Sequence, residues 1–388
     1  MKIVRLVDLC FRYQNSETIN LQHINLEIET GEFIVFTGKS GCGKSTLLNI
    51  ISGVLAKDGK NYFSGSMYLK QNAVLENDFE ELSPLVAMVF QNPEDQLFAE
   101  TVYEEVAFAL KNKRLPKEEI HKKVLTILQF VGLQGMEERD IRQLSGGQQQ
   151  RLALASMVVH EPELLILDEP LSQIDPQGAR DLLTLLCKLI KKYNMTILMA
   201  EHRLHEVLEF CDRLIIMEGG KIVSDNSIQK IVANALILKQ FSLRVPPALM
   251  ISEHFSIQPP TMDREILIKE MRKKEFHIDH TLPSAMERTG SDALILKNIT
   301  YKYGNHTGIN AISLCFKSNS FNALIGANGS GKSTLLKIIG GLLKPQNGKI
   351  ETGLQTSMIL QNPDLMLFNY TVKEEVLCEA YNKGVTVS

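Results

Sequence analysis

The chain has 388 residues, of which 44% are hydrophobic and 22% charged, and its formal net charge is −3 at pH 7. This length is sufficient for two domains with their own cores, and the composition is that of an ordinary soluble protein. The slightly negative balance gives no basic surface for nucleic acid or anionic lipid, which argues against both classes of partner.

Membrane insertion, export and cysteine-based metal binding are not expected either. No apolar run reaches the roughly 18 residues of a transmembrane helix, and the N-terminus lacks the apolar core of a signal peptide. The six cysteines have no metal-binding spacing, so we expect reduced thiols in a cytosolic protein.

The first part of the chain alternates between strand and helix patterns. Short apolar runs at 31–37, 163–168 and 195–200 predict buried parallel strands, while 46–52 and 178–193 have helical periodicity. This alternation predicts an α/β fold, with a parallel sheet covered on both faces, over residues 1–228.

A glycine-rich loop follows the first of these strands. Residues 38–46 read GKSGCGKST, and the pattern recurs at 326–334 as GANGSGKST. In such a loop, backbone N–H groups converge on phosphate oxygens at a helix N-terminus. Lys44 is expected to hold the β- and γ-phosphates and Ser45 to offer its hydroxyl to Mg²⁺. A small-residue role for Cys42 is favoured over redox control.

The binding candidates of the first loop are Gly38, Lys39, Ser40, Gly41, Cys42, Gly43, Lys44, Ser45 and Thr46. Those of the second loop are Gly326, Asn328, Gly329, Ser330, Gly331, Lys332, Ser333 and Thr334.

The most diagnostic segment is residues 144–151, LSGGQQQR, in which Ser145, Gly146 and Gly147 lie just before a helix predicted at 148–160. Donors at that helix N-terminus can face an anion. The segment resembles the signature of ATP-binding cassette ATPases. That resemblance implies a P-loop NTPase fold, in which an antiparallel β subdomain and a helical subdomain flank the parallel sheet. It also implies nucleotide binding by Ser145, Gly146, Gly147 and Gln148.

The resemblance extends to the ends of the other two predicted strands. Residues 164–170, LLILDEP, are similar to the family's Walker B strand. Asp168 is therefore implied to hold Mg²⁺ through water, and Glu169 to polarise the attacking water. His202, just past the strand that ends at Ala200, matches the switch histidine that contacts the γ-phosphate.

Other positions match family motifs individually. Gln91 matches the glutamine that joins Mg²⁺ and the attacking water to the partner-facing subdomain, and Tyr13 the aromatic residue that stacks on adenine. Asp175 is placed to communicate across a dimer, although Gln173 departs from the usual small residue. The catalytic candidates are Lys44, Gln91, Glu169 and His202, and the metal candidates are Ser45, Gln91, Asp168, Ser333 and Gln361.

Residues 229–290 differ from what precedes them. They contain five prolines and a charged run at 269–275, which favours a surface extension and linker with short helices.

Residues 291–388 repeat the beginning of the chain. Residues 296–303 echo 6–13, so Tyr303 corresponds to Tyr13, and 361–368 echo 91–98. A duplication explains this. The loop lysine and the glutamine are 47 positions apart in the first copy and 29 in the second, which places about 18 extra residues near 58–85. We therefore predict a complete ATPase domain at 1–228, an extension and linker at 229–290, and a truncated second domain at 291–388.

A narrower resemblance rests on residues 89–108, VFQNPEDQLFAETVYEEVAF, and on LRVPP at 243–247. Both are similar to the energy-coupling-factor ATPases, which drive prokaryotic uptake of vitamins and metal ions such as cobalt. This implies integral membrane partners that contact the groove near Gln91, and a second ATPase domain in cis or in trans, including a homodimer. It also implies a cytoplasmic, peripheral position on the inner face of the membrane.

The second copy has no LSGGQ segment, Asp-Glu strand end or switch histidine. In the family, each ATP lies between one copy's phosphate loop and the other's signature. Lys332 with Ser145 could bind ATP without a water-activating carboxylate, whereas Lys44 with Glu169 would lack a facing signature. We expect slow hydrolysis by an isolated chain, and a poorly folded second copy whose sheet lacks later strands.

Two alternatives stay open. One is a soluble double-cassette protein acting on ribosomes or DNA, which the mixed charge of the linker disfavours. The other is an inactive fragment of an interrupted gene. The transported solute is not readable from an ATPase that never touches it.

Overall fold

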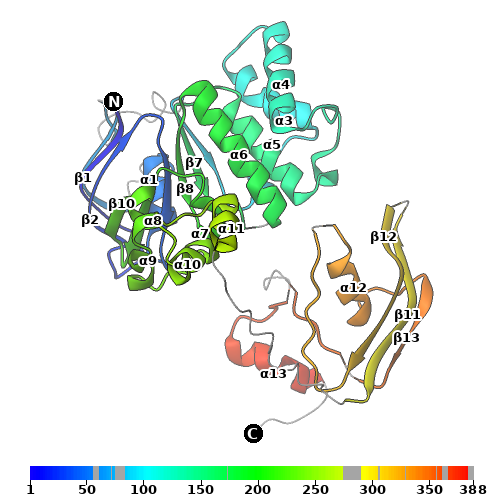
Figure 1. Cartoon of the computed structure of the whole chain (residues 1–388). Helices are drawn as coiled ribbons and strands as arrows, with labels where there is room; N and C mark the ends of the chain where they lie inside the picture. Colours follow the sequence, from blue (N-terminus) through cyan, green and yellow to red (C-terminus); the bar gives the residue numbers. More distant parts are fainter. Residues whose placement is uncertain are drawn as a thin grey trace. The chain divides into compact units, whose positions relative to one another are not determined.

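The computed structural model describes residues 1–55, 61–70, 72–74, 84–172, 174–273, 290–304, 306–327, 329–354, 356–360 and 366–382. The chain divides into two compact units, Met1–Phe276 and His277–Ser388 (Figure 1). Across these described ranges, no helix combines the length and the apolar character needed to cross a membrane.

The central sheet of the first unit has six strands. Their order is β10 (Lys221–Ser227), β9 (Arg213–Glu218), β3 (Phe33–Thr37), β8 (Thr196–Ala200), β7 (Leu164–Asp168) and β6 (Val86–Val89). All neighbours pair in parallel except β10 with β9. Strands β3, β7 and β8 confirm the three predicted ones, and every residue of β3 and β8 is buried.

Both faces of this sheet are covered, as the alternation along β3 demonstrates. Phe33 and Val35 belong to one core cluster, with the inner faces of α3 to α6, whereas Ile34 and Phe36 belong to a second, with α1. Alternate residues of a strand point to opposite faces, so each face has its own core. The helices are α1 (Lys44–Ile51), α3 (Val102–Asn112), α4 (Lys117–Val131), α5 (Gly146–Val158), α6 (Pro176–Tyr193) and α7 (Leu204–Val207), with short 3₁₀ turns η1 (Pro93–Asp95) and η2 (Ile141–Gln143).

An antiparallel sheet packs on the α1 side. Its order is β2 (Leu21–Glu29), β1 (Lys2–Arg12), β4 (Tyr62–Leu69) and β5 (Asn72–Ala73), and its buried residues join the second core cluster. Strands β4 and β5 lie where the extra residues of the first copy were expected. The α/β class with an antiparallel and a helical subdomain is thus confirmed, and helices α3, α4 and α5 stand together in Figure 1.

The extension after the sheet forms four short helices, α8 (Ile228–Ala233), α9 (Leu236–Gln240), α10 (Pro247–His254) and α11 (Arg264–Arg272). It is more than a surface appendage, because Ile231, Leu238, Val245 and Leu249 join the first core cluster.

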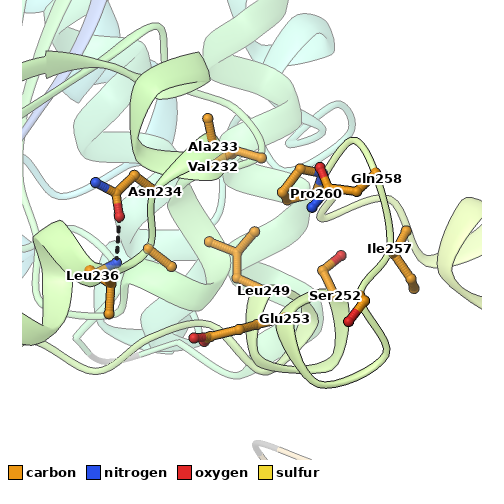
Figure 2. Close-up of a pocket in the computed structure, with 12 residues that line it drawn as sticks. Val232, Ala233, Asn234, Leu236, Leu249, Ser252, Glu253, Ile257, Gln258 and Pro260 are labelled. Atoms are coloured by element: carbon orange, nitrogen blue, oxygen red, sulfur yellow. Dashed lines mark hydrogen bonds between the residues drawn. The ribbon is translucent and has the colours of Figure 1, made fainter.

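A pocket of about 280 Å³ opens between α10 and the turn that joins α8 to α9 (Figure 2). Several of its polar side chains are already paired: the Ser252 hydroxyl bonds to the backbone of Thr261, and Glu253 pairs with Lys239. No residue of either glycine-rich loop lines it. We therefore do not assign the phosphate chemistry to this pocket.

The second unit repeats part of the first. Its antiparallel sheet has the order β12 (His306–Lys317), β11 (Asp292–Tyr303) and β13 (Asn347–Thr352), which mirrors β2, β1 and β4. Helices α12 (Lys332–Ile339) and α13 (Val372–Asn382) mirror α1 and α3. A small apolar core joins the sheet to α12, formed by Leu294, Leu296, Ile299, Ile309, Leu335 and Ile338.

The parallel half of the second unit is different. Residues 321–325 correspond in sequence to β3 and 356–359 to β6, yet neither segment is a strand. Phe321 and Ile325 are each 90% exposed and Ile359 is 89% exposed. In the first unit, β3 lies between β8 and β9 and β6 lies beside β7. Two strands separate β3 from β6, so their counterparts are not natural partners for each other.

One buried histidine makes the stability of the first unit pH-dependent. His160 follows α5, and its buried Nδ1 has no hydrogen-bond partner among the described residues. Burial, aided by the nearby charge of Lys113, lowers the pKa of His160 from 6.5 to about 4. Between these values the unfolded chain binds more protons than the folded one, so stability falls as pH falls through this window.

We predict that His160→Gln loses less unfolding free energy than the wild type between pH 7 and pH 4.5. Urea midpoints at both values measure this. His254→Gln is the control, since His254 is exposed at the end of α10, and it should follow the wild type. Equal losses in His160→Gln and the wild type would contradict the assignment.

Candidate active site

The first glycine-rich loop folds tightly between β3 and α1. Gly38 has φ +143° and Gly43 has φ +104°, conformations that side chains disfavour. A Cβ on Gly38 would lie 2.1 Å from the carbonyl oxygen of Met217 on β9. The Lys44 side chain is buried, and its Nζ donates to the carbonyls of Gly38 at 3.0 Å and Lys39 at 3.2 Å. The loop is thus embedded in the sheet edge, with its lysine held over its own backbone.

Two side-chain oxygens, one from α1 and one from β7, meet at the end of β7. The Ser45 hydroxyl donates to Asp168 Oδ1 at 3.0 Å. Burial raises the pKa of Asp168; the bond from Ser45 opposes that rise and the charge of Glu169 adds to it. A hydroxyl and a carboxylate side by side are hard oxygen donors, which fit Mg²⁺. These two residues are the ones that would hold the ion.

The Glu169 carboxylate lies between two further candidate catalytic residues. Its Oε2 accepts a hydrogen bond from Gln91 Nε2 at 3.1 Å, and its Oε1 lies 2.9 Å from His202 Nε2. Its backbone has φ +45°, a left-handed conformation that is uncommon for a non-glycine residue and typical of functional positions. The structure therefore brings Gln91, Glu169 and His202 into one cluster next to Asp168.

Sequence reasoning missed the residue that supports His202. Glu201 directly follows β8, is 2% exposed, and its Oε1 accepts hydrogen bonds from the backbone N–H groups of His202 at 2.8 Å and Arg203 at 3.0 Å. Burial raises the pKa of Glu201, and these two bonds oppose the rise. A carboxylate directly after an all-apolar strand was the signal that could have identified it.

Tyr13 lies against the same loop. Its hydroxyl is 3.2 Å from Thr46 Oγ1, and its ring meets Phe11 edge-on with centroids 4.9 Å apart. The ring is half-buried beside the loop, so an adenine-stacking role stays a prediction that the geometry permits.

The signature lies apart from this cluster. Ser145 caps α5: its hydroxyl accepts from Gln148 N–H, and the Gln148 side chain accepts from Ser145 N–H at 2.9 Å, a capping box. Gly146 and Gly147 form the first turn of α5, which packs against α3 and α4 in the helical subdomain. Nucleotide binding by these four residues stays a prediction for a site completed by another cassette.

The second unit reproduces the loop in detail. Lys332 Nζ donates to the carbonyls of Gly326 at 2.8 Å and Ala327 at 2.7 Å, the counterparts of Gly38 and Lys39. Tyr303 reaches Thr334 as Tyr13 reaches Thr46. The surroundings differ, because Gly326 and Ser330 are exposed whereas their counterparts Gly38 and Cys42 are buried. Gly329 and Ser333 are exposed like their counterparts Gly41 and Ser45. Gly331 caps α12 as Gly43 caps α1. Gln173, Asn328 and Gln361 lie outside the described residues.

Comparison with known proteins identifies this architecture. The family model described as "ABC transporter" matches residues 21–172 and 309–378, more than half of the chain and both phosphate loops. The chain belongs to the ABC transporter ATPase family. ATP is therefore its nucleotide, and its enzyme class is ATP hydrolysis coupled to transport.

Curated relatives share 32–36% identity with it over 89–99% of its length, and the chain spans 62–72% of theirs. One of them, from Bacillus subtilis, is named as the HMP/thiamine import ATP-binding protein YkoD; it is 32% identical over 97% of this chain and 71% of its own.

Two solved structures match the first unit's fold. CbiO1 of Clostridium perfringens, described as part of the ABC transporter complex CbiONQ, has a TM-score of 0.57 and 31% identity over 65% of this chain and 99% of its own. A dimeric ATP-binding cassette bound to ADP and phosphate, MJ0796, has a TM-score of 0.52 and 30% identity over 58% and 98%.

The loop geometry gives a matched pair of tests. A Cβ at Gly38 meets the Met217 carbonyl, whereas a Cβ at Gly41, at φ +75°, meets nothing within 4 Å. We predict that Gly38→Ala weakens ATP binding by more than about tenfold, while Gly41→Ala costs only about 1 kcal/mol of stability. A fluorescent ATP analogue and the melting temperature measure both. Equal affinities in the two variants would contradict the close-packed geometry.

Proposed function

We propose that this protein is the ATP-binding and ATP-hydrolysing subunit of an importer of the energy-coupling-factor type, which powers the uptake of a vitamin or a metal ion through a membrane partner. The observation that carries the hydrolytic part is the Glu169 carboxylate held between Gln91 and His202, beside the Ser45–Asp168 pair. All of these residues follow strands whose carboxyl ends meet at one edge of the sheet.

Each residue has a chemical task in this proposal. The loop N–H groups and Lys44 bind the triphosphate, and Ser45 and Asp168 hold Mg²⁺, which neutralises charge on the phosphate oxygens. Glu169 orients the attacking water and polarises it by accepting a hydrogen bond from it. Its contacts with Gln91 and His202 fix the carboxylate in place, so that water activation depends on both loops.

The importer type rests on three supports. The first is the resemblance of residues 89–108 to energy-coupling-factor ATPases. The second is that CbiO1 is described as part of CbiONQ, and the third is that YkoD is named for HMP/thiamine import. Phe98 and Phe108 belong to the first of these segments and are 64% and 45% exposed, with ring centroids 4.6 Å apart. This aromatic pair suits contact with an integral membrane subunit at the cytoplasmic face.

The protein is proposed to work as a pair of cassettes. Its sequence holds one signature and one Asp-Glu strand end, both in the first unit. The second unit repeats the phosphate loop, and among its described residues no carboxylate bonds to Ser333. The proposed function therefore includes a second cassette, in cis or in trans, as the partner that completes the site; another copy of the protein is one such partner. A ribosome- or DNA-directed role has no comparable support at a net charge of −3.

The test of the hydrolytic assignment is Glu169→Gln. We predict that hydrolysis falls by a factor of about 10² or more, because the water loses its acceptor, while ATP affinity stays within about threefold. Glu163→Gln is the control: Glu163 precedes the same strand and pairs with Lys70 on the surface, so both quantities should match the wild type. A Glu169→Gln variant that hydrolyses ATP at the wild-type rate would overturn the proposal.

A further inference from the structure

Arg203 follows the switch histidine and turns its side chain toward a different loop. Its Nη1 donates to the main-chain carbonyl of Leu171 at 2.5 Å and to that of Ile174 at 3.0 Å. Its Nη2 pairs with Glu206 on α7. The side chain is only 25% exposed. A guanidinium that grips two carbonyls of one turn is a specific arrangement, since surface arginines seldom order main chain in this way.

The two segments that Arg203 joins both contact Glu169, one through its main chain and the other through its carboxylate. The 171–175 turn begins just after Glu169, whose carbonyl accepts from Ser172 N–H at 3.2 Å. On the other side, Glu201 holds the backbone of His202 and Arg203, and His202 reaches Glu169. These contacts form a closed ring. Glu169 contacts His202, the neighbouring Arg203 bonds to the turn, and the turn bonds back to the main chain of Glu169.

The 171–175 turn also leads to the residue expected to face a second cassette. Asp175 caps α6, and its Oδ1 accepts from Gly178 N–H at 2.8 Å. Within the turn, the Ile174 N–H donates to the Leu171 carbonyl at 3.3 Å, near the limit for such a bond. The guanidinium adds charge-assisted hydrogen bonds to the carbonyls of Leu171 and Ile174.

We propose that Arg203 is a positioning residue that locks the switch loop (Glu201, His202 and Arg203) to the 171–175 turn, so that His202 and Asp175 move as one body. This inference rests on the proposed function, in which a second cassette meets the turn. Closure of that cassette on Asp175 is then transmitted through the two carbonyls to Arg203, and by its backbone to His202 and Glu169. Hydrolysis at one site becomes conditional on the state of the partner.

Lysine cannot replace arginine here. An ammonium is a compact donor without the planar fork that reaches two carbonyls and a carboxylate together. The buried carbonyls of Leu171 and Ile174 would lose partners, which loosens the turn without altering Lys44, Ser45 or Asp168. The loss should thus fall on turnover and cooperativity, and not on ATP affinity.

The test compares Arg203→Met and Arg203→Lys with Arg213→Met in the full chain. Arg213 is a matched control: it is 21% exposed, pairs with Asp225 and Glu32, and donates to the Glu27 carbonyl, all outside the switch loop and the turn. We predict that both Arg203 variants lower kcat about tenfold or more, leave KM for ATP within about twofold, and bring the Hill coefficient for ATP toward one. Arg213→Met should lower the melting temperature and leave these kinetic parameters unchanged.

Arg203→Lys keeps the positive charge, so it still tests the inference if Arg203→Met misfolds. If Arg203→Lys melts like the wild type and also turns over ATP like the wild type, the inference is overturned. Failure of the proposed function itself is recognised separately, because it would leave Glu169→Gln fully active.

Discussion

The register of three buried parallel strands determines where the catalytic residues of the first unit lie. Phe36 on β3 and Asp168 on β7 are both paired with Ala200 on β8, so the three strands end together. The phosphate loop follows the first strand, Glu169 the second and His202 the third. All residues of β3 and β8 are buried, on both faces of the sheet. A one-residue slip in register would move every side chain of the strand to the opposite face, where it does not fit the core. Packing of the core thereby fixes the distances within the catalytic cluster.

The second unit separates what a loop sequence determines from what its surroundings determine. Both copies curl the lysine over the first two carbonyls of the loop and place tyrosine beside threonine. Local sequence is therefore enough for the loop conformation. The packing around the loop differs between the two copies: Gly38 packs against Met217 of β9, while Gly326 is exposed. Packing against a neighbouring strand gives the first loop additional support for the conformation that binds phosphate.

Much of this arrangement could be predicted from the sequence. The apolar runs before Gly38, at Asp168 and at Ala200 identified three central strands. The loop motif indicated Lys44 and Ser45, and the resemblance to ABC ATPases indicated Gln91, Glu169 and His202; the structure brings these residues together. Arg203 was missed because its partners are main-chain carbonyls, which leave no trace in side-chain patterns. The core role of the 229–273 extension was missed for a related reason: Leu238 and Leu249 lie on short helices without a long apolar period. The signature was recognised as a motif, and its nucleotide contacts stay a prediction.

The central claim of the proposed function is that ATP lies at a junction to which one cassette gives its phosphate loop and another its signature. Mixing Lys44→Ala, which keeps an intact signature, with Ser145→Arg, which keeps an intact loop, tests it most directly. Each variant alone should be nearly inactive, and the mixture should regain hydrolysis through one restored junction per mixed pair, increasingly so at higher protein concentration. A mixture no more active than its components would contradict the account.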